Sequence, residues 1–192
     1  MRSSLDCIPC FVRQAIDAAR MASKETAVHE HIVHEILPWI AEADLSQSPP
    51  SFAQHIHRRL RALTESDDPH REAKARHNEM ALRLLPELRT TIAKAPHPLE
   101  AAVRLAIAGN VVDMGVNTDI SESDLRRAMA QALNEPVAGQ LDDFYLAVER
   151  AGSILYLTDN AGEIAFDRLL IERLDPDRVI VAVRGAPVIN DA

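Results

Sequence analysis

The sequence contains only two cysteines, Cys7 and Cys10, which form a CxxC pair. No disulfide framework can be built beyond this one short pair, so a reducing compartment is the expectation. The residues that follow Met1 include no apolar segment of the kind that a signal peptide needs. No apolar run approaches the roughly 18 residues that are needed to cross a bilayer. We therefore expect a cytoplasmic protein without a membrane partner.

The chain also lacks an excess of basic residues, because its formal net charge is −8 over 192 residues. Proteins that bind nucleic acid through a charged surface are usually basic, so nucleic acid is not an expected partner. The content of hydrophobic residues, 47%, and of charged residues, 26%, is ordinary for a soluble globular protein.

The first 150 residues predict a helical region. Apolar residues recur there at helical spacing, and clusters of proline, serine and glycine separate the segments. Pro38 is expected to kink or divide the second helix, and Gly109 with Asn110 marks the end of a buried one. The expected helices are 9–22, 24–43, a third ending near 63, a long charged one after Pro69, 99–108, one opening at 121–124, and 144–150.

The character of the sequence changes near residue 150. Residues 153–158 and 179–183 are short β-rich apolar runs, and residues 163–174 between them are helical. Strand, helix and strand at this spacing predict a parallel βαβ unit. We therefore expect an α/β fold (α+β overall), with a helical region at 1–150 packed on the start of an α/β/α sandwich at 151–192. Two parallel strands are not stable alone, so we expect further strands beyond Ala192.

Polar residues follow the first predicted strand. Asp159 and Asn160 stand where the strand ends and a helix begins, the edge at which open α/β sheets bind ligands. A helix N-terminus offers backbone N–H groups and positive dipole charge to a phosphate, and Gly162 permits close backbone approach. Asn160 and Glu163 also have the spacing of a capping box, so a plain helix cap explains these residues equally well by spacing alone.

A second acidic residue should reach the same edge. Asp191 lies in the loop after the second strand, and a right-handed crossover places both strand ends on one side of the sheet. Two carboxylates and an amide oxygen suit Mg²⁺ or Mn²⁺ and leave positions open for water and substrate. The alternative is that Asp191 is a solvated loop residue.

Several segments together resemble the DUF89 family of damage-control phosphatases, which are ARMT1-like, and in particular its CxxC-bearing prokaryotic branch. The matches come in family order and span the chain. They are Leu5 to Cys10, Asp68-Pro69-His70 with Lys74 and Asn78, Ala108 to Asp113, Leu157 to Asp167, and Arg184 to Ala192. One departure is His70, which stands where the family more often has tyrosine.

The resemblance implies a metal-dependent phosphatase that acts on small phosphorylated metabolites such as sugar phosphates. It implies that a divalent metal (Mg, Mn, Co or Ni) is held by Asp159, Asn160 and Asp191. The predicted catalytic residues are Asp159, Asn160 and Glu163, and the predicted substrate-binding residues are Asn110, Asp113 and Gly162. Either a water molecule or Asp159 can be the nucleophile. Family members extend beyond this chain, and a phosphate-binding lysine is expected in that part.

Two other hypotheses stay open from the sequence. The chain can be a non-catalytic fragment that binds metal and phosphate without turnover. It can also be a zinc or redox protein built on Cys7 and Cys10, although no second CxxC is present and a structural role is favoured for this pair. The sequence does not indicate an oligomeric state.

Overall fold

The computed structural model describes residues 2–64, 67–112, 120–187 and 191. These residues form two compact units. The first comprises the described residues up to Glu72 together with Ala186 and Pro187, and the second comprises Ala73–Gly185 together with Asp191. The change in sequence character near residue 150 lies inside the second unit, between helix α7 (Leu141–Arg150) and strand β1 (Ile154–Leu157). A domain boundary at that position stays a prediction.

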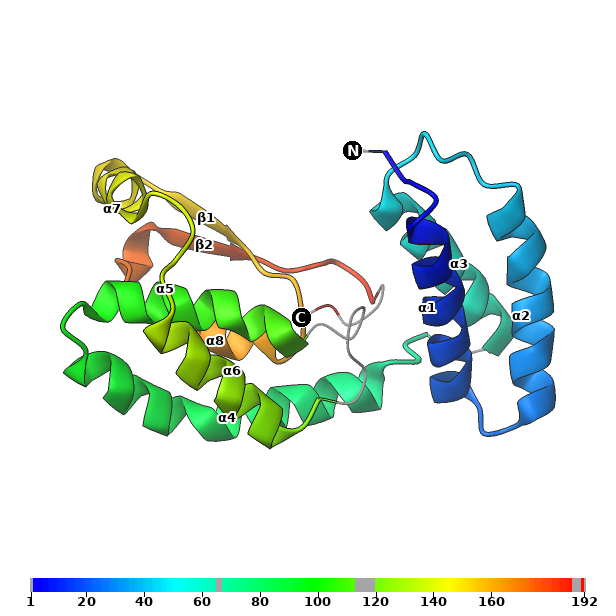
Figure 1. Ribbon diagram of the computed structural model, residues 1–192, viewed down its shortest axis with the longest axis horizontal. Coiled ribbons are helices and arrows are strands. Elements are labelled where there is room, and N and C mark those ends of the chain that lie inside the picture. Colours follow the sequence, from blue (N-terminus) through cyan, green and yellow to red (C-terminus); the bar gives the residue numbers. More distant parts are fainter. Residues whose placement is uncertain (1, 65–66, 113–119, 188–190, 192) are drawn as a thin grey trace. The chain divides into compact units, whose positions relative to one another are not determined.

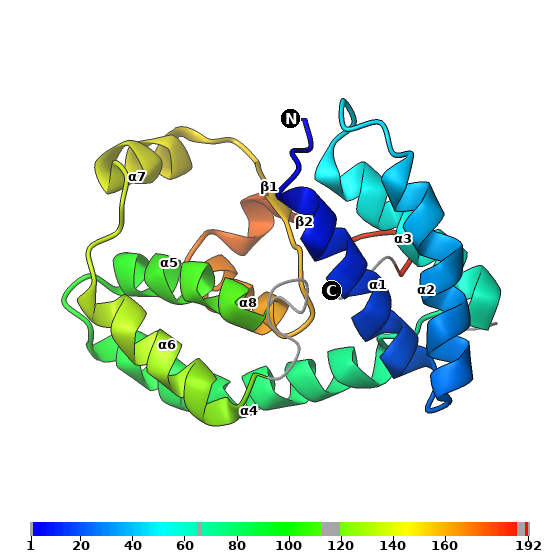
Figure 2. The same ribbon diagram turned by 45° about the vertical axis from the view of Figure 1, so that its right-hand side comes forward.

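The first unit contains three helices, α1 (Cys7–Ala22), α2 (Thr26–Ala41) and α3 (Pro49–Thr64). They run side by side in both views of the chain (Figures 1 and 2). Each helix buries one apolar stripe, and the shared core includes Phe11, Ala18, Ala19, Ile32, Ile36, Phe52, Ile56 and Leu60. Pro38 does not divide α2, because it lies in the last turn, where few helical hydrogen bonds remain to be lost.

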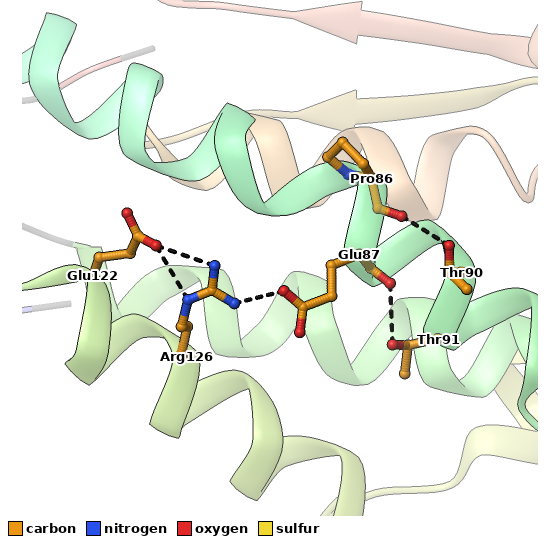
Figure 3. A network of polar contacts seen from close by, with 6 residues as sticks. All are labelled: Pro86, Glu87, Thr90, Thr91, Glu122 and Arg126. Atoms are coloured by element: carbon orange, nitrogen blue, oxygen red, sulfur yellow. Dashed lines mark hydrogen bonds and ion pairs between the residues drawn. The ribbon is translucent and has the colours of Figure 1, made fainter.

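The long helix α4 (Arg71–Lys94) continues through Pro86, which cannot donate a backbone hydrogen bond. Figure 3 shows how polar side chains surround this point. The hydroxyl groups of Thr90 and Thr91 donate to the carbonyl oxygens of Pro86 and Glu87 at 3.0 and 3.1 Å. Arg126 of α6 (Glu122–Asn134) donates to the Glu87 carboxylate at 2.5 Å. The region around Pro86 is thus tied to a second helix.

The core of the second unit is formed by α4, α5 (Pro98–Gly109), α6 and α8 (Glu163–Ile171). Helix α5 ends at Gly109 as expected and continues as a short 3₁₀ turn, η1 (Asn110–Val112). A Cβ atom on Gly109 would lie 3.0 Å from the ring of Phe166, so the glycine allows α5 and α8 to approach closely. None of the helices that the structure describes is long and apolar enough to cross a membrane.

The second unit also contains the predicted βαβ arrangement. Strands β1 and β2 (Val179–Ala182) pair in parallel, from Ile154 opposite Val179 to Leu157 opposite Ala182. The 3₁₀ turn η2 (Pro176–Arg178) connects α8 to β2. Both views show α5 and α8 on one side of the strands (Figures 1 and 2). The predicted fold class, a mostly helical chain with a parallel α/β element, is confirmed.

The two faces of this small sheet differ in their exposure to solvent. Ile154, Tyr156 and Val179 pack against the core of the second unit. Leu157 and Ile180 are 70% and 61% exposed. Among the described residues, therefore, the sheet is covered on one face, whereas a buried parallel sheet needs cover on both.

Candidate functional site

The turn after β1 is held to the second strand before it turns toward α8. The backbone N–H and the hydroxyl of Thr158 both donate to the carbonyl oxygen of Ala182, each at 3.1 Å. The chain then passes through Asp159 and Asn160 to Gly162, which directly precedes the first residue of α8. Among the described residues no side chain caps the N-terminus of this helix, so the capping interpretation of Asp159, Asn160 and Glu163 is wrong.

Gly162 makes the close approach that the sequence suggested, but its neighbour is α4. Its φ angle is 87°, in the left-handed region. A Cβ atom at this position would lie 3.1 Å from Cβ of His77. The N–H of Gly162 donates to Oδ1 of Asn78 at 2.6 Å. This N–H is therefore bound by the protein itself, and its predicted role in substrate binding stays a prediction.

Glu163 forms hydrogen bonds with two of the predicted site residues. Its Oε2 atom accepts a hydrogen bond from Nδ2 of Asn160 at 2.7 Å and another from Nδ2 of Asn110 at 3.2 Å. Asn160 is 3% exposed, so its orientation is fixed by this contact. Because its amide nitrogen points to Glu163, its amide oxygen points away and is the atom suited to a cation. Asp113 lies outside the described residues.

Asp191 lies next to Asn160. The two residues form an antiparallel backbone bridge, although they follow different strands. The Asp191 side chain is 7% exposed, and its Oδ2 atom lies 3.6 Å from Nζ of Lys74 on α4. The interpretation of Asp191 as a solvated loop residue is therefore wrong, and its backbone lies beside that of Asn160.

Asp159 has a different environment. Its side chain is 55% exposed, and its Oδ1 atom lies 2.7 Å from Nη2 of Arg184, which follows β2. Among the residues that the structure describes, no three His, Cys, Asp or Glu side chains form a cluster suited to a metal. The predicted set of Asp159, Asn160 and Asp191 instead contains two carboxylates and one amide. Such hard oxygen donors fit Mg²⁺ or Mn²⁺ in their chemistry.

A buried acid lies one helical turn after Glu163. The hydroxyl of Tyr156 on β1 donates to Oδ1 of Asp167 on α8 at 2.7 Å, and Asp167 is 4% exposed. Burial raises the pKa of Asp167 to about 6; the Tyr156 hydrogen bond opposes this rise, and the charges of Glu163 and Asp159 add to it. Burial also raises the pKa of Tyr156. This pair joins the strand before the turn to the helix after it.

Sequence reasoning gave no role to Lys74, Asn78 or Arg184, although all three stand in family-like segments. One signal was available, because Lys74 and Asn78 are four residues apart and so share one helix face. The spacing of residues along the chain does not show that this face of α4 contacts the turn after β1. It also does not show that Arg184 contacts Asp159.

The other candidate features belong to the first unit. Cys7 and Cys10 are free thiols in the first turn of α1, and the backbone N–H of Ser4 lies 3.4 Å from Sγ of Cys7. A pocket of about 510 Å³ is lined by residues of α2 and α3, including Trp39 and His55. It contains none of the predicted site residues.

The chain as a whole is similar to known proteins. The family model described as the damage-control phosphatase ARMT1-like domain matches residues 3–192. The chain belongs to this family. It is 32% identical over 198 residues to a damage-control phosphatase of Archaeoglobus fulgidus, covering 100% of this chain and 68% of that protein. It is 30% identical over 199 residues to a damage-control phosphatase of Pyrococcus horikoshii, covering 100% of this chain and 67% of that protein.

A solved structure supports the fold. The crystal structure of a DUF89 family protein from Pyrococcus horikoshii matches with a TM-score of 0.83 and 29% identity, covering 100% of this chain and 67% of that chain. A protein of Methanocaldococcus jannaschii is 30% identical over 198 residues, which cover 97% of this chain and 64% of that protein. The ARMT1-like chain thus spans about two thirds of the length of these relatives. Family membership supports phosphatase function on phosphorylated metabolites.

Proposed function

We propose that this chain provides the metal- and phosphate-binding turn of a phosphatase that requires a divalent cation and hydrolyses small phosphorylated metabolites, with sugar phosphates as the expected class. The observation that carries the proposal is the bridge between Asn160 and Asp191. It joins an amide and an acidic residue from two separate strand ends at the edge where α/β sheets bind ligands.

The proposed ligands are the Asp159 and Asp191 carboxylates and the Asn160 amide oxygen. A divalent ion held there would polarise a phosphoryl oxygen and lower the pKa of a bound water molecule. The protein's own part is to hold these donors in place. Glu163 orients the Asn160 amide, and Asn78 fixes the turn through the N–H of Gly162. An all-oxygen set favours Mg²⁺ and Mn²⁺ over softer ions, with Co²⁺ and Ni²⁺ as further candidates.

The test is hydrolysis of p-nitrophenyl phosphate and a panel of sugar phosphates in the presence of Mg²⁺, Mn²⁺, Co²⁺ or Ni²⁺. We expect phosphate release that depends on the metal. Asp159→Ala and Asp191→Ala should each lower the rate at least about 100-fold, because each removes a proposed ligand of the metal that would stabilise the developing charge. Asp143→Ala, which removes an exposed carboxylate on α7, should leave the rate unchanged.

Undiminished hydrolysis by the Asp159→Ala variant would contradict the proposal. If the wild-type chain binds the metal but releases no phosphate from any substrate, the catalytic part of the proposal is wrong and a binding module is the better description. Titration of the chain with Mn²⁺ by calorimetry separates these two results.

A further inference from the structure

The two acidic residues of the site each have a cation beside them, but the two ion pairs differ in exposure. Arg184 and Asp159 are 2.7 Å apart, with side chains 46% and 55% exposed. Lys74 and Asp191 are 3.6 Å apart, with side chains 13% and 7% exposed. The first pair is open to solvent and the second is enclosed.

This difference in exposure sets how easily each pair can separate. An exposed ion pair contributes little to stability, since water replaces the lost contact. Separating an enclosed pair leaves a buried charge without compensation, which is costly. Arg184 can therefore leave Asp159 readily, whereas Lys74 is expected to stay beside Asp191.

Arg184 contacts a carboxylate group that the proposed function assigns to the metal. Nη2 of Arg184 contacts Oδ1 of Asp159, and a guanidinium and a divalent ion cannot both occupy that oxygen at contact distance without strong repulsion. The doubly charged ion gains more from the carboxylate than the guanidinium does. Metal binding should therefore release Arg184.

We propose that Arg184 covers Asp159 until the divalent cation binds and that the released guanidinium then binds the phosphoryl group of the substrate. The inference rests on the proposed function. The planar guanidinium presents paired N–H donors that match two phosphate oxygens. Arg184 follows β2 as Asp159 follows β1, so the released side chain remains at the strand ends where the substrate has to reach the metal.

The proposal predicts effects of opposite sign for a single substitution. Arg184→Gln removes the competitor for Asp159, so Mn²⁺ should bind about fivefold more tightly in the absence of phosphate. The same change removes a phosphate ligand, so inorganic phosphate should bind to the Mn²⁺-loaded chain at least about tenfold more weakly. A purely structural role for Arg184 would not weaken one ligand and strengthen the other.

The experiment is calorimetric titration of the full chain, first with Mn²⁺ and then with inorganic phosphate. The matched control is Arg168→Gln, which removes the same charge and another exposed ion pair, with Glu172 at 2.8 Å, from the same unit. Both affinities of this control should stay within about twofold of wild type, as expected for an exposed charge that contacts neither ligand.

The outcomes distinguish this inference from the proposed function. If the wild-type chain does not bind Mn²⁺, the proposed function itself is wrong. If the wild-type chain binds Mn²⁺ and the Arg184→Gln variant binds it equally or more weakly, the competition is absent and the inference is overturned. If Mn²⁺ binds more tightly but phosphate binding is unchanged, Arg184 is a counterion of Asp159 alone, and the second half of the inference is overturned.

Discussion

Gly162 is the residue at which backbone geometry and packing act together. Its φ angle of 87° is one that residues with a Cβ atom rarely adopt. A Cβ atom there would lie 3.1 Å from Cβ of His77 and 3.2 Å from its carbonyl oxygen. The conformation directs the Gly162 N–H to Asn78 and starts α8 directly afterwards. Any side chain at this position therefore disturbs both the turn and its support on α4.

We expect Gly162→Ala to lower the free energy of unfolding by about 2 kcal/mol, because it adds backbone strain and a close contact with His77. Urea denaturation measures the change. Gly152→Ala is the control, since a Cβ atom there meets nothing within 4 Å and the φ angle is not positive. Its effect should stay within about 0.5 kcal/mol. Equal effects of the two substitutions would show that Gly162 is not constrained in this way.

The residues of the turn were predictable in part. The position of Asp159 and Asn160 after a strand follows from the apolar run that precedes them. The start of the helix at Glu163 was also predicted and is confirmed, although Asn160 is itself a favourable cap; the left-handed backbone of Gly162 directly precedes this start. The contacts of Lys74 and Arg184 were not predictable, since they depend on how distant segments approach one another.

The Tyr156–Asp167 hydrogen bond connects β1 to α8. The carboxyl group is buried between the strand and the helix, and its pKa of about 6 lies above the ordinary value of 3.8. The folded chain therefore holds this proton more tightly than the unfolded chain does. Ionised Asp167 opposes folding above pH 6, and the opposition disappears as the pH falls toward 4.

We expect Asp167→Asn to remove this pH dependence, because the amide can accept from Tyr156 but has no proton to lose. The free energy of unfolding of the variant minus that of wild type should rise by about 2 kcal/mol between pH 4 and pH 8. Urea denaturation across this range gives the difference. The control is Asp143→Asn, an exposed acid on α7. A pH-independent difference for Asp167→Asn would contradict the raised pKa.

The helices themselves were well predicted because their apolar stripes are regular. The prolines were harder to interpret. Pro38 was expected to divide or kink its helix, yet α2 runs unbroken to Ala41. Pro86 lies well inside α4, and the helix continues with contacts to α6 around that point. Helix propensity gives the free energy that a proline costs a helix, but tertiary contacts decide whether the helix still forms around it.

The sheet leaves a set of large apolar side chains exposed. Strand residues alternate between the two faces, so the residues that do not meet the core face away from it. The exposed ones on this face are Leu155, Leu157 and Ile180, with exposed fractions from 61% to 70%. Sequence reasoning expected cover for this face from the continuous apolar runs, and the described residues supply none.

Contiguous exposed apolar side chains are unusual on a soluble monomer and promote association. We expect the chain to bind the dye 8-anilinonaphthalene-1-sulfonate and to associate as its concentration rises in analytical ultracentrifugation. The double variant Leu157→Thr with Ile180→Thr should lower the dye fluorescence at least about twofold without lowering the melting temperature, because these side chains contribute little to the core.

Leu5→Thr provides the matched control, since Leu5 is 77% exposed but belongs to the first unit and not to the sheet. A single exposed leucine costs a soluble protein little, so this variant should bind the dye as wild type does. If Leu5→Thr and the double variant reduce the fluorescence equally, the dye binds exposed apolar side chains in general and not the sheet face in particular. If only the double variant reduces it, and association falls with it, the sheet face is the surface responsible.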